Sequence, residues 1–192
     1  GLKWSIIVTL LLVATTMLAP SVTDDRPIAR LVPGRCHTQV IHRMNITTRL
    51  ADAEIIIIDG AMGTELQRRD VPLNFEIWSA AALLSHPHLV QEIHVDYIRA
   101  GAEIQIAATY NTAPHVINPS SFDTTSQELT ATALQLVREG IDVAEPAHPV
   151  WIAGSISTTV ESRRKEMLDI SMLRDSFTEH AENLAEQGCD LL

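Results

Sequence analysis

From residue 54 onward, short unbroken apolar runs alternate with longer stretches whose apolar residues recur at helical spacing. Apolar runs without polar alternation are typical of strands covered on both faces, as in a parallel sheet. The runs predict three such strands and the start of a fourth, at residues 55–58, 102–109, 150–153 and 189–192. The first run is made of isoleucine alone, so we expect it to be buried within the sheet.

Amphipathic stretches lie between these runs and predict helices. The first helix begins near Pro87, a residue that suits the first helical position. The second begins at Thr124 or Thr125, because a Gln or Glu follows each of them at capping-box spacing. The third covers about residues 171–188. Its inward-facing residues are expected to be Leu173, Phe177, Ala181 and Leu184.

This alternation of strand and helix favours a parallel sheet in an α/β fold. The pattern alone does not separate a closed barrel from an open, doubly wound sheet. A chain of 192 residues allows one ordinary domain and is shorter than the roughly 250 residues typical of a complete (β/α)8 barrel. No Gly-x-Gly-x-x-Gly or Walker-type loop follows the first predicted strand, so the sequence offers no support for a nucleotide site.

The first part of the chain has a different character. An apolar run over residues 4–19 follows Lys3, as in a secretory signal, but it is short for a transmembrane helix, which needs about 20 residues. We therefore expect residues 1–19 to be a signal-like or anchor-like segment, or else an upstream extension that is buried or disordered. Residues 20–53 contain prolines and scattered arginines and are expected to be a linker. Residues 54–192 would then form the folded domain.

Composition and charge exclude several classes of protein. With 46% apolar and 20% charged residues, the chain has a globular rather than a disordered composition. Its net charge of −10 argues against a nucleic-acid-binding surface, because phosphate contacts need clustered Lys and Arg. The two cysteines, Cys36 and Cys189, are too few for a disulfide framework or for a Cys-rich zinc site within one chain.

Several segments occur in a recognisable order along the chain. They are Ile58-Asp59-Gly60-Ala61-Met62-Gly63-Thr64-Glu65-Leu66, His86-Pro87-His88-Leu89-Val90, Thr109-Tyr110, Ala153-Gly154-Ser155-Ile156 and Gly188-Cys189-Asp190-Leu191-Leu192. Together they resemble the homocysteine S-methyltransferase family over about residues 54–192. The resemblance implies a (β/α)8 barrel, of which this chain would hold the first half. It also implies transfer of a methyl group to the sulfur of homocysteine, from a donor such as S-methylmethionine, betaine or methylfolate, to give methionine.

The resemblance also indicates which residues would contact the substrate. They lie in the first loop and at the ends of the next two strands, at the face where barrels place their active sites. The expected substrate-binding residues are Asp59, Gly60, Glu65, Thr109, Tyr110 and Ser155. Taken without the resemblance, Asp59-Gly60 is also a common turn dipeptide, and the other side chains could be ordinary loop polarity. No catalytic residue is predicted.

The expected cofactor is zinc, but its ligands are not expected in this chain. A thiol has a pKa of about 8.5, so it is mostly protonated at neutral pH and needs activation. The resemblance implies a Zn²⁺ ion held by three cysteines of later strands, and neither Cys36 nor Cys189 matches a ligand motif. We expect no metal ligand among the residues present.

Four other residues stand out by type. His86, His88 and His94 are close in sequence, but a zinc site would need them to converge with a further ligand. We expect them at a helix start and on its solvent face. Trp78 could line a site for a cationic methyl donor, because aromatic faces attract such groups, or it could serve in packing.

The sequence thus predicts a homocysteine S-methyltransferase that lacks the zinc-binding half. The alternative is a non-catalytic remnant or an amino-acid-binding module, directed to a membrane through residues 4–19. The expected partners are homocysteine, a small methyl donor and, through open sheet edges, other copies of the chain; nucleic acid is not expected. The expected location is the cytoplasm, with membrane anchoring or secretion as the alternative if the apolar segment acts as a signal.

Overall fold

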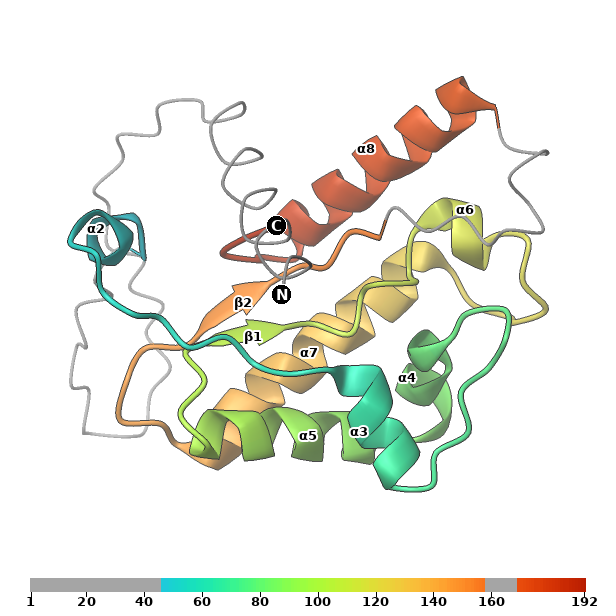
Figure 1. Ribbon diagram of the computed structural model, residues 1–192. Helices are drawn as coiled ribbons and strands as arrows, with labels where there is room; N and C mark the ends of the chain where they lie inside the picture. Colours follow the sequence, from blue (N-terminus) through green and yellow to red (C-terminus); the bar gives the residue numbers. More distant parts are fainter. Residues whose placement is uncertain (1–45, 158–168) are drawn as a thin grey trace, which may run out of the picture. The chain divides into compact units, whose positions relative to one another are not determined.

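The structure is a computed structural model, and it describes residues 46–157 and 169–192, all within one compact unit, Ile41–Leu192. Strands β1 (Ile104–Ile106) and β2 (Trp151–Ala153) lie among helices (Figure 1). The helices are α2 (Ile46–Ala51), α3 (Met62–Arg68), α4 (Ala82–Ser85), α5 (Pro87–Arg99), α6 (Pro114–Ile117), α7 (Ser126–Ala144) and α8 (Ile170–Glu186), with a 3₁₀ turn, η1, at Ser79–Ala81. The apolar run at residues 4–19 and Cys36 lie outside the described residues.

The sheet is parallel, as the alternation of strand and helix predicts. β1 pairs with β2 so that Ile104 lies opposite Trp151. A parallel bridge joins Ile58 to Ile104 on one side, and another joins Ala153 to Leu191 on the other. Four chain segments therefore lie side by side in sequence order. The prediction of a mixed α/β fold with parallel strands is confirmed.

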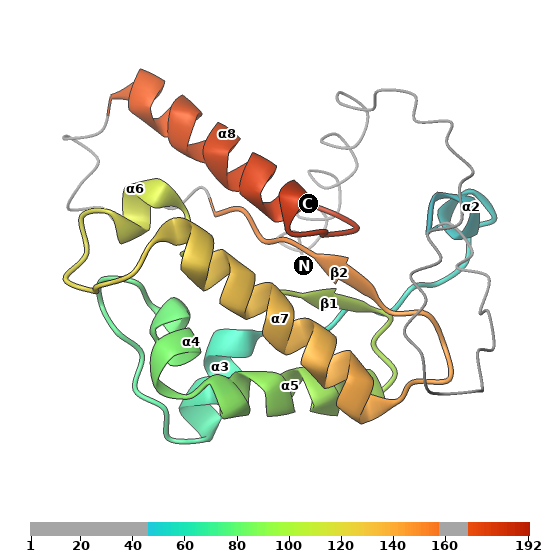
Figure 2. The same ribbon diagram turned by 180° about the vertical axis from the view of Figure 1, so that it is seen from behind.

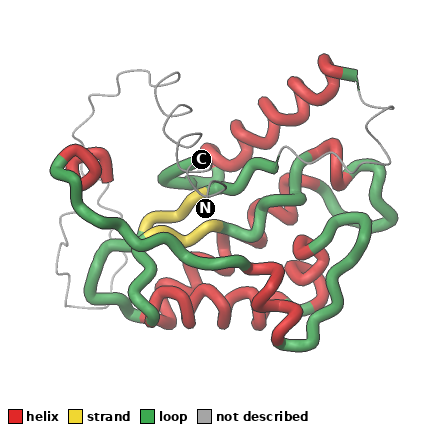
Figure 3. Tube along the Cα trace, viewed as in Figure 1, coloured by secondary structure: helices red, strands yellow, loops and turns green. Residues whose placement is uncertain are grey.

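The first predicted strand is present only as the bridge at Ile58, and its expected burial is wrong. Figure 3 shows that the chain beside the two strands is mostly loop here. Ile55, Ile57 and Ile58 are 86%, 52% and 48% exposed. The physical reason is that this segment has a neighbour on one side only, because it bridges to β1 and no other described strand pairs with it.

Helices α5 and α7 pack against each other and support the sheet (Figures 1 and 2). Helix α5 begins with Pro87, as predicted, and Gly101 follows its end with φ at +103°, a conformation that glycine adopts at no steric cost. Helix α7 is capped by Thr125. Its hydroxyl accepts from the Glu128 N–H, and the Glu128 carboxylate accepts from the Thr125 N–H. Of the two predicted capping residues, the structure therefore selects Thr125.

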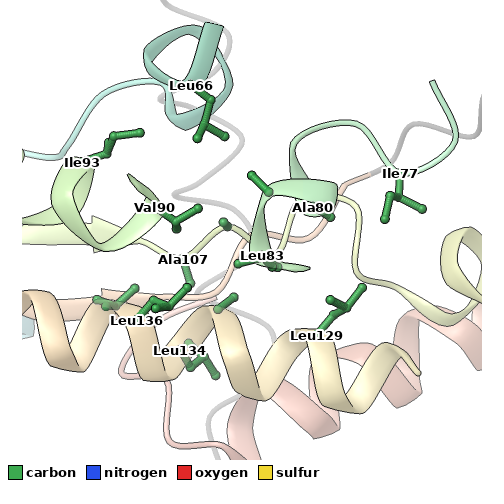
Figure 4. Close-up of a cluster of buried hydrophobic side chains, with 14 of the residues drawn as sticks. Leu66, Ile77, Ala80, Leu83, Val90, Ile93, Ala107, Leu129, Leu134 and Leu136 are labelled. Atoms are coloured by element: carbon green, nitrogen blue, oxygen red, sulfur yellow. The ribbon is translucent and has the colours of Figure 1, made fainter. Parts of the chain in front are cut away.

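The core lies between these helices and the sheet, and helices α3 and α4 contribute to it (Figure 4). Each fully buried aliphatic side chain contributes about 1.5–3 kcal/mol of hydrophobic free energy. The large, fully buried apolar residues are Leu66, Ile77, Val90, Ile93, Ile117, Leu129, Leu134, Val137 and Leu184.

Helix α8 buries a different stripe from the one predicted. Leu184 is buried as expected, but Leu173, Phe177 and Ala181 are only partly buried. The buried residues at helical spacing are instead Ser176, His180 and Asn183. Ser176 on this face accepts from the His115 N–H and lies 2.8 Å from His115 Nδ1, next to α6. The buried ring nitrogens of His180 and the Oδ1 atom of Asn183 have no hydrogen-bond partner among the described residues.

Helix α2 lies within the range expected to be a linker, and Arg49 connects it to the sheet. The Arg49 guanidinium lies 2.6 Å from Glu54 Oε2 and 2.5 Å from Glu103 Oε1. It also lies over the Trp151 ring, 5.4 Å from the ring centroid, which is a cation–π geometry. Residues 46–54 therefore contact the amino-terminal ends of both strands.

No helix in the described part of the chain is long and apolar enough to cross a membrane.

Candidate functional site

Asp59 is bound to β1 through both its main chain and its side chain. Its N–H donates to the Ile104 carbonyl at 3.0 Å, and its Oδ2 accepts from the Ile106 N–H at 2.9 Å. The second carboxylate oxygen, Oδ1, is buried and has no hydrogen-bond partner among the described residues. The structure therefore fixes this carboxylate and leaves one acceptor oxygen for another group.

The environment of Asp59 disfavours its negative charge. Burial raises the pKa of Asp59 to about 7, and the hydrogen bond from the Ile106 N–H only partly opposes this. At neutral pH the carboxyl group therefore exchanges between its neutral and ionised forms. A cation placed near Oδ1 would favour the ionised form, because an opposite charge within hydrogen-bonding distance lowers a carboxyl pKa.

A side chain at Gly60 would meet the ring of Tyr97, which would have to move to make room. A Cβ atom at this position would lie 2.6 Å from the Tyr97 hydroxyl oxygen and 2.8 Å from Cζ of the same ring. Tyr97 belongs to α5, so the loop after the first strand segment lies directly against that helix.

Thr109 and Ser155 are brought together across the sheet, beyond the ends of β1 and β2. The Thr109 hydroxyl donates to the Ser155 carbonyl at 3.1 Å and accepts from the Ser155 N–H at 2.8 Å. Thr109 is fully buried. Its hydroxyl thus fixes the loop after β2 relative to the end of β1, which is a positioning role.

The other two predicted binding residues lie at the surface of this region. Tyr110 follows Thr109 and is 44% exposed. Glu65 lies on α3, and its carboxylate pairs with Arg68 at 2.8 Å and with Arg69 at 2.9 Å. The Glu65 carboxylate is therefore engaged by arginines of its own helix end.

Two features of this region have no signal in the sequence. Tyr97 occurs in the apolar stripe of a helix, so periodicity indicates packing and does not reveal that it meets Gly60. Trp78 has φ +51° and ψ −129°, which is a strained conformation for a residue with a Cβ atom. It is 49% exposed, and its indole nitrogen would lie 3.3 Å from a Cβ atom at Gly63.

A buried polar layer lies behind the loops after the strands. His180 of α8 is fully buried, and burial lowers its pKa, while the main chain at Ser155 and Thr109 acts in the opposite direction. His115 Nδ1 lies 2.8 Å from the Ser176 hydroxyl, and burial also lowers the His115 pKa. Both rings are thereby biased toward the neutral form, which avoids a buried charge.

The residues present do not fit a zinc site. Within residues 46–157 and 169–192, no group of three or more His, Cys, Asp or Glu side chains could hold a metal ion. Burial raises the pKa of the Cys189 thiol to about 11, so it is a poor thiolate ligand.

The expectation of a solvent-facing His94 is wrong, because His94 is fully buried and its Nδ1 lies 3.0 Å from Gln105 Oε1.

Together, the parallel sheet and the polar residues that follow its strands define an α/β protein whose candidate site residues lie at the strand ends. The family model for homocysteine S-methyltransferase matches residues 56–192. The chain therefore belongs to the homocysteine S-methyltransferase family.

Relatives and solved structures agree with this assignment. The chain is 30% identical over 163 residues to a selenocysteine methyltransferase of Astragalus bisulcatus, an alignment that covers 71% of this chain and 48% of that protein. It is 30% identical over 151 residues to a homocysteine S-methyltransferase of Escherichia coli (strain K12), with 72% and 49% covered. The metallated crystal structure of the E. coli homocysteine methyltransferase MmuM superposes with a TM-score of 0.62 at 29% identity, covering 74% of this chain and 54% of that one. The chain thus spans about half the length of the curated relatives it matches.

Proposed function

We propose that residues 54–192 form the first half of a (β/α)8 barrel and hold homocysteine for methyl transfer to its sulfur, which gives methionine. Family membership and the order of the parallel segments support this proposal. In such barrels, active sites lie at the carboxyl ends of the strands, where Thr109 and Ser155 meet.

The observation that carries the proposal is the buried Oδ1 atom of Asp59, which has no partner in the described part of the chain. Homocysteine carries an α-ammonium group, and an ammonium ion donates strong hydrogen bonds to a carboxylate. Binding would satisfy Oδ1 and would favour the ionised form of a carboxyl group whose pKa is otherwise raised to about 7. Gly60 would let the ligand approach the main chain closely.

We assign the methyl donor to the exposed aromatic side of the same region. Methyl donors of the sulfonium or quaternary ammonium type carry a positive charge, which aromatic faces attract. Trp78 and Tyr110 are both about half exposed; the indole of Trp78 lies beside Gly63 of α3, and Tyr110 directly follows Thr109. Glu65 would contribute to the site from α3, just after the first loop, where its carboxylate forms ion pairs with Arg68 and Arg69.

In the complete protein, the proposed zinc ion would activate the homocysteine thiol as a thiolate. The residues described here do not fit that ion, so its ligands would come from another part of the barrel. The contribution of this chain is to bind and orient the amino-acid end of the substrate. A second candidate, an amino-acid-binding module without catalysis, is favoured by the same lack of a metal-ligand group among the described residues.

Titration calorimetry of the full chain with L-homocysteine, near pH 7.5, tests the proposal. We expect saturable binding that Asp59→Asn weakens by at least about tenfold, because a charge-assisted hydrogen bond is lost. Asp52→Asn, at an exposed carboxylate, is the matched control and should leave affinity unchanged. Methyl transfer from S-methylmethionine, measured with Zn²⁺ after the chain has been joined to a second half-barrel that carries the zinc ligands, separates the two candidates, because the amino-acid-binding module gives binding without transfer. Equal affinity of the wild type and Asp59→Asn would refute the proposed role of Asp59.

The proposal extends to self-association and location. The main-chain groups at residues 55–58 and at 191–192 lie at the two edges of the parallel array, and open edges can pair with other chains. We therefore expect the chain, produced alone, to dimerise or aggregate; a monodisperse monomer in sedimentation would contradict this. We propose a cytoplasmic location, with anchoring or secretion through residues 4–19 as the alternative.

A further inference from the structure

The side chain of Tyr97, on α5, lies close to Gly60 in the first loop. The hydroxyl oxygen, Cζ and Cε1 of Tyr97 all lie within 2.9 Å of the position that a Gly60 Cβ atom would take. The aromatic ring therefore fills the space beside the residue that directly follows Asp59. A shift of this loop toward α5 is blocked by the ring.

Ion pairs connect the carboxyl-terminal end of α3, which follows this loop, to α5. Arg69, just after α3, pairs with Glu65 at 2.9 Å and with Asp96 at 2.7 Å. Asp96 precedes Tyr97 on α5. The segment from Asp59 to the end of α3 thus meets one turn of α5 at two points, the Tyr97 ring beside Gly60 and an exposed ion pair just after α3.

We infer that Tyr97 is a positioning residue that fixes the Asp59 carboxylate for ligand binding by holding Gly60 in place. The inference rests on the proposed function, since it concerns the same site. Asp59 has one oxygen bound to the Ile106 N–H and one oxygen left over. Only a fixed main chain at Gly60 keeps the first bond intact while the second oxygen faces a ligand.

The pKa shifts of Tyr97 and Asp59 agree with this geometry. Burial raises the pKa of Tyr97, and the carboxylates of Glu65 and Asp59 raise it further. The Tyr97 hydroxyl therefore stays protonated at physiological pH and remains a neutral group beside the loop. The ring lies beside the residue that follows Asp59, and the pKa of Asp59 is raised by burial.

Two measurements that need no ligand test the inference on the full chain. The first is an NMR titration of the labelled Asp59 carboxyl group, and the second is hydrogen exchange of the Ile106 amide. In Tyr97→Ala we expect the Asp59 pKa to fall by about one unit as water reaches the carboxylate, and the Ile106 amide to exchange at least about tenfold faster. Tyr97→Phe retains the ring and should shift both readouts in the same direction by less. Asp96→Asn breaks only the exposed ion pair and is the matched control.

A double-mutant cycle tests the contact itself. Gly60→Ala should accelerate Ile106 exchange in the wild-type background, because the new methyl group collides with the ring. It should add nothing in the Tyr97→Ala background, where the space is empty. An additive effect of Gly60→Ala in both backgrounds would overturn the inference.

Homocysteine affinity then separates this inference from the proposed function. We expect Tyr97→Ala to lower affinity at least about tenfold, with Asp96→Asn close to wild type. If the wild type binds no homocysteine, the proposed function fails, while the titration and the exchange still decide whether Tyr97 positions Asp59. If Tyr97→Ala only lowers the melting temperature and leaves the Asp59 titration and Ile106 exchange unchanged, Tyr97 is a packing residue and the inference is wrong. Tyr97→Phe supplies the same comparison if Tyr97→Ala does not fold.

Discussion

Replacing Asp59 by Asn should stabilise the folded protein at neutral and alkaline pH. Asn has nearly the same shape, and its side-chain oxygen can accept the hydrogen bond from the Ile106 N–H that Asp59 Oδ2 accepts. Its amide group carries no charge, so burial costs less than it does for a carboxylate. The substitution therefore removes the unfavourable ionisation of the buried carboxyl group, while the new amide nitrogen takes the partnerless position of Oδ1 and offsets part of the gain.

The size of the effect follows from the shift in pKa. The folded-state pKa of Asp59, about 7, lies roughly three units above its ordinary value of 3.8, and each unit corresponds to about 1.4 kcal/mol. Because the folded pKa is raised, the protonated carboxyl group stabilises the folded state at low pH. This stability is lost as the pH rises from about 4 to about 7. Asp59→Asn should therefore gain up to about 4 kcal/mol above pH 7, an upper limit because Asp59 is only partly buried.

Urea unfolding, followed by circular dichroism at several pH values between about 4 and 8.5, measures this difference. Other titrating groups are common to both proteins, so they cancel in the comparison. Asp52→Asn, at an exposed carboxylate, should give a curve parallel to that of the wild type. If the curve for Asp59→Asn is also parallel to the wild type across this range, the reasoning from burial to pKa to stability is refuted.

Three further predictions concern other buried or capping groups. Burial lowers the pKa of His94 from 6.5 to about 4, so the folded state binds fewer protons, and stability should fall by up to about 3 kcal/mol as the pH falls from 6.5 to 4; His94→Gln should lack this loss in denaturation measured across the same range. Thr109→Val should lower the free energy of unfolding by about 1–3 kcal/mol, because both Ser155 main-chain groups lose their partner, whereas Thr109→Ser should remain close to wild type in urea unfolding. Thr125→Ala should cost about 1 kcal/mol through loss of the helix cap, and Thr125→Ser should restore it in thermal melts; an equal loss in both variants would contradict the capping role.

The order of the elements and several of their ends could be predicted from the sequence, because these depend on neighbouring residues. A capping box needs only Thr125 and Glu128, three residues apart. The parallel arrangement follows from the spacing of the apolar runs and from the helices between them. The order of motifs in the first loop and at the later strand ends was also sufficient to predict the family.

The burial of individual residues could not be predicted in the same way. The isoleucines of residues 55–58 resemble a buried strand, yet they are exposed because one sheet edge has no described neighbour. Helix α8 has an apolar stripe, yet it buries Ser176, His180 and Asn183, because the surface that it meets is polar. Periodicity indicates that one face of a helix is more apolar than the other, but the surface against which the helix packs determines which face is buried.

The amino-acid sequence by itself was sufficient to place Asp59 and Gly60 directly after the first apolar run and to predict the family to which the chain belongs. Only the tertiary structure decided that Tyr97, 37 positions after Gly60, lies where a side chain at Gly60 would be. It also decided that one carboxylate oxygen of Asp59 accepts a hydrogen bond while the other has no partner among the described residues. The physical reason is range. Turn and helix preferences act between residues a few positions apart, whereas desolvation and side-chain contact depend on segments that meet only when the chain is folded.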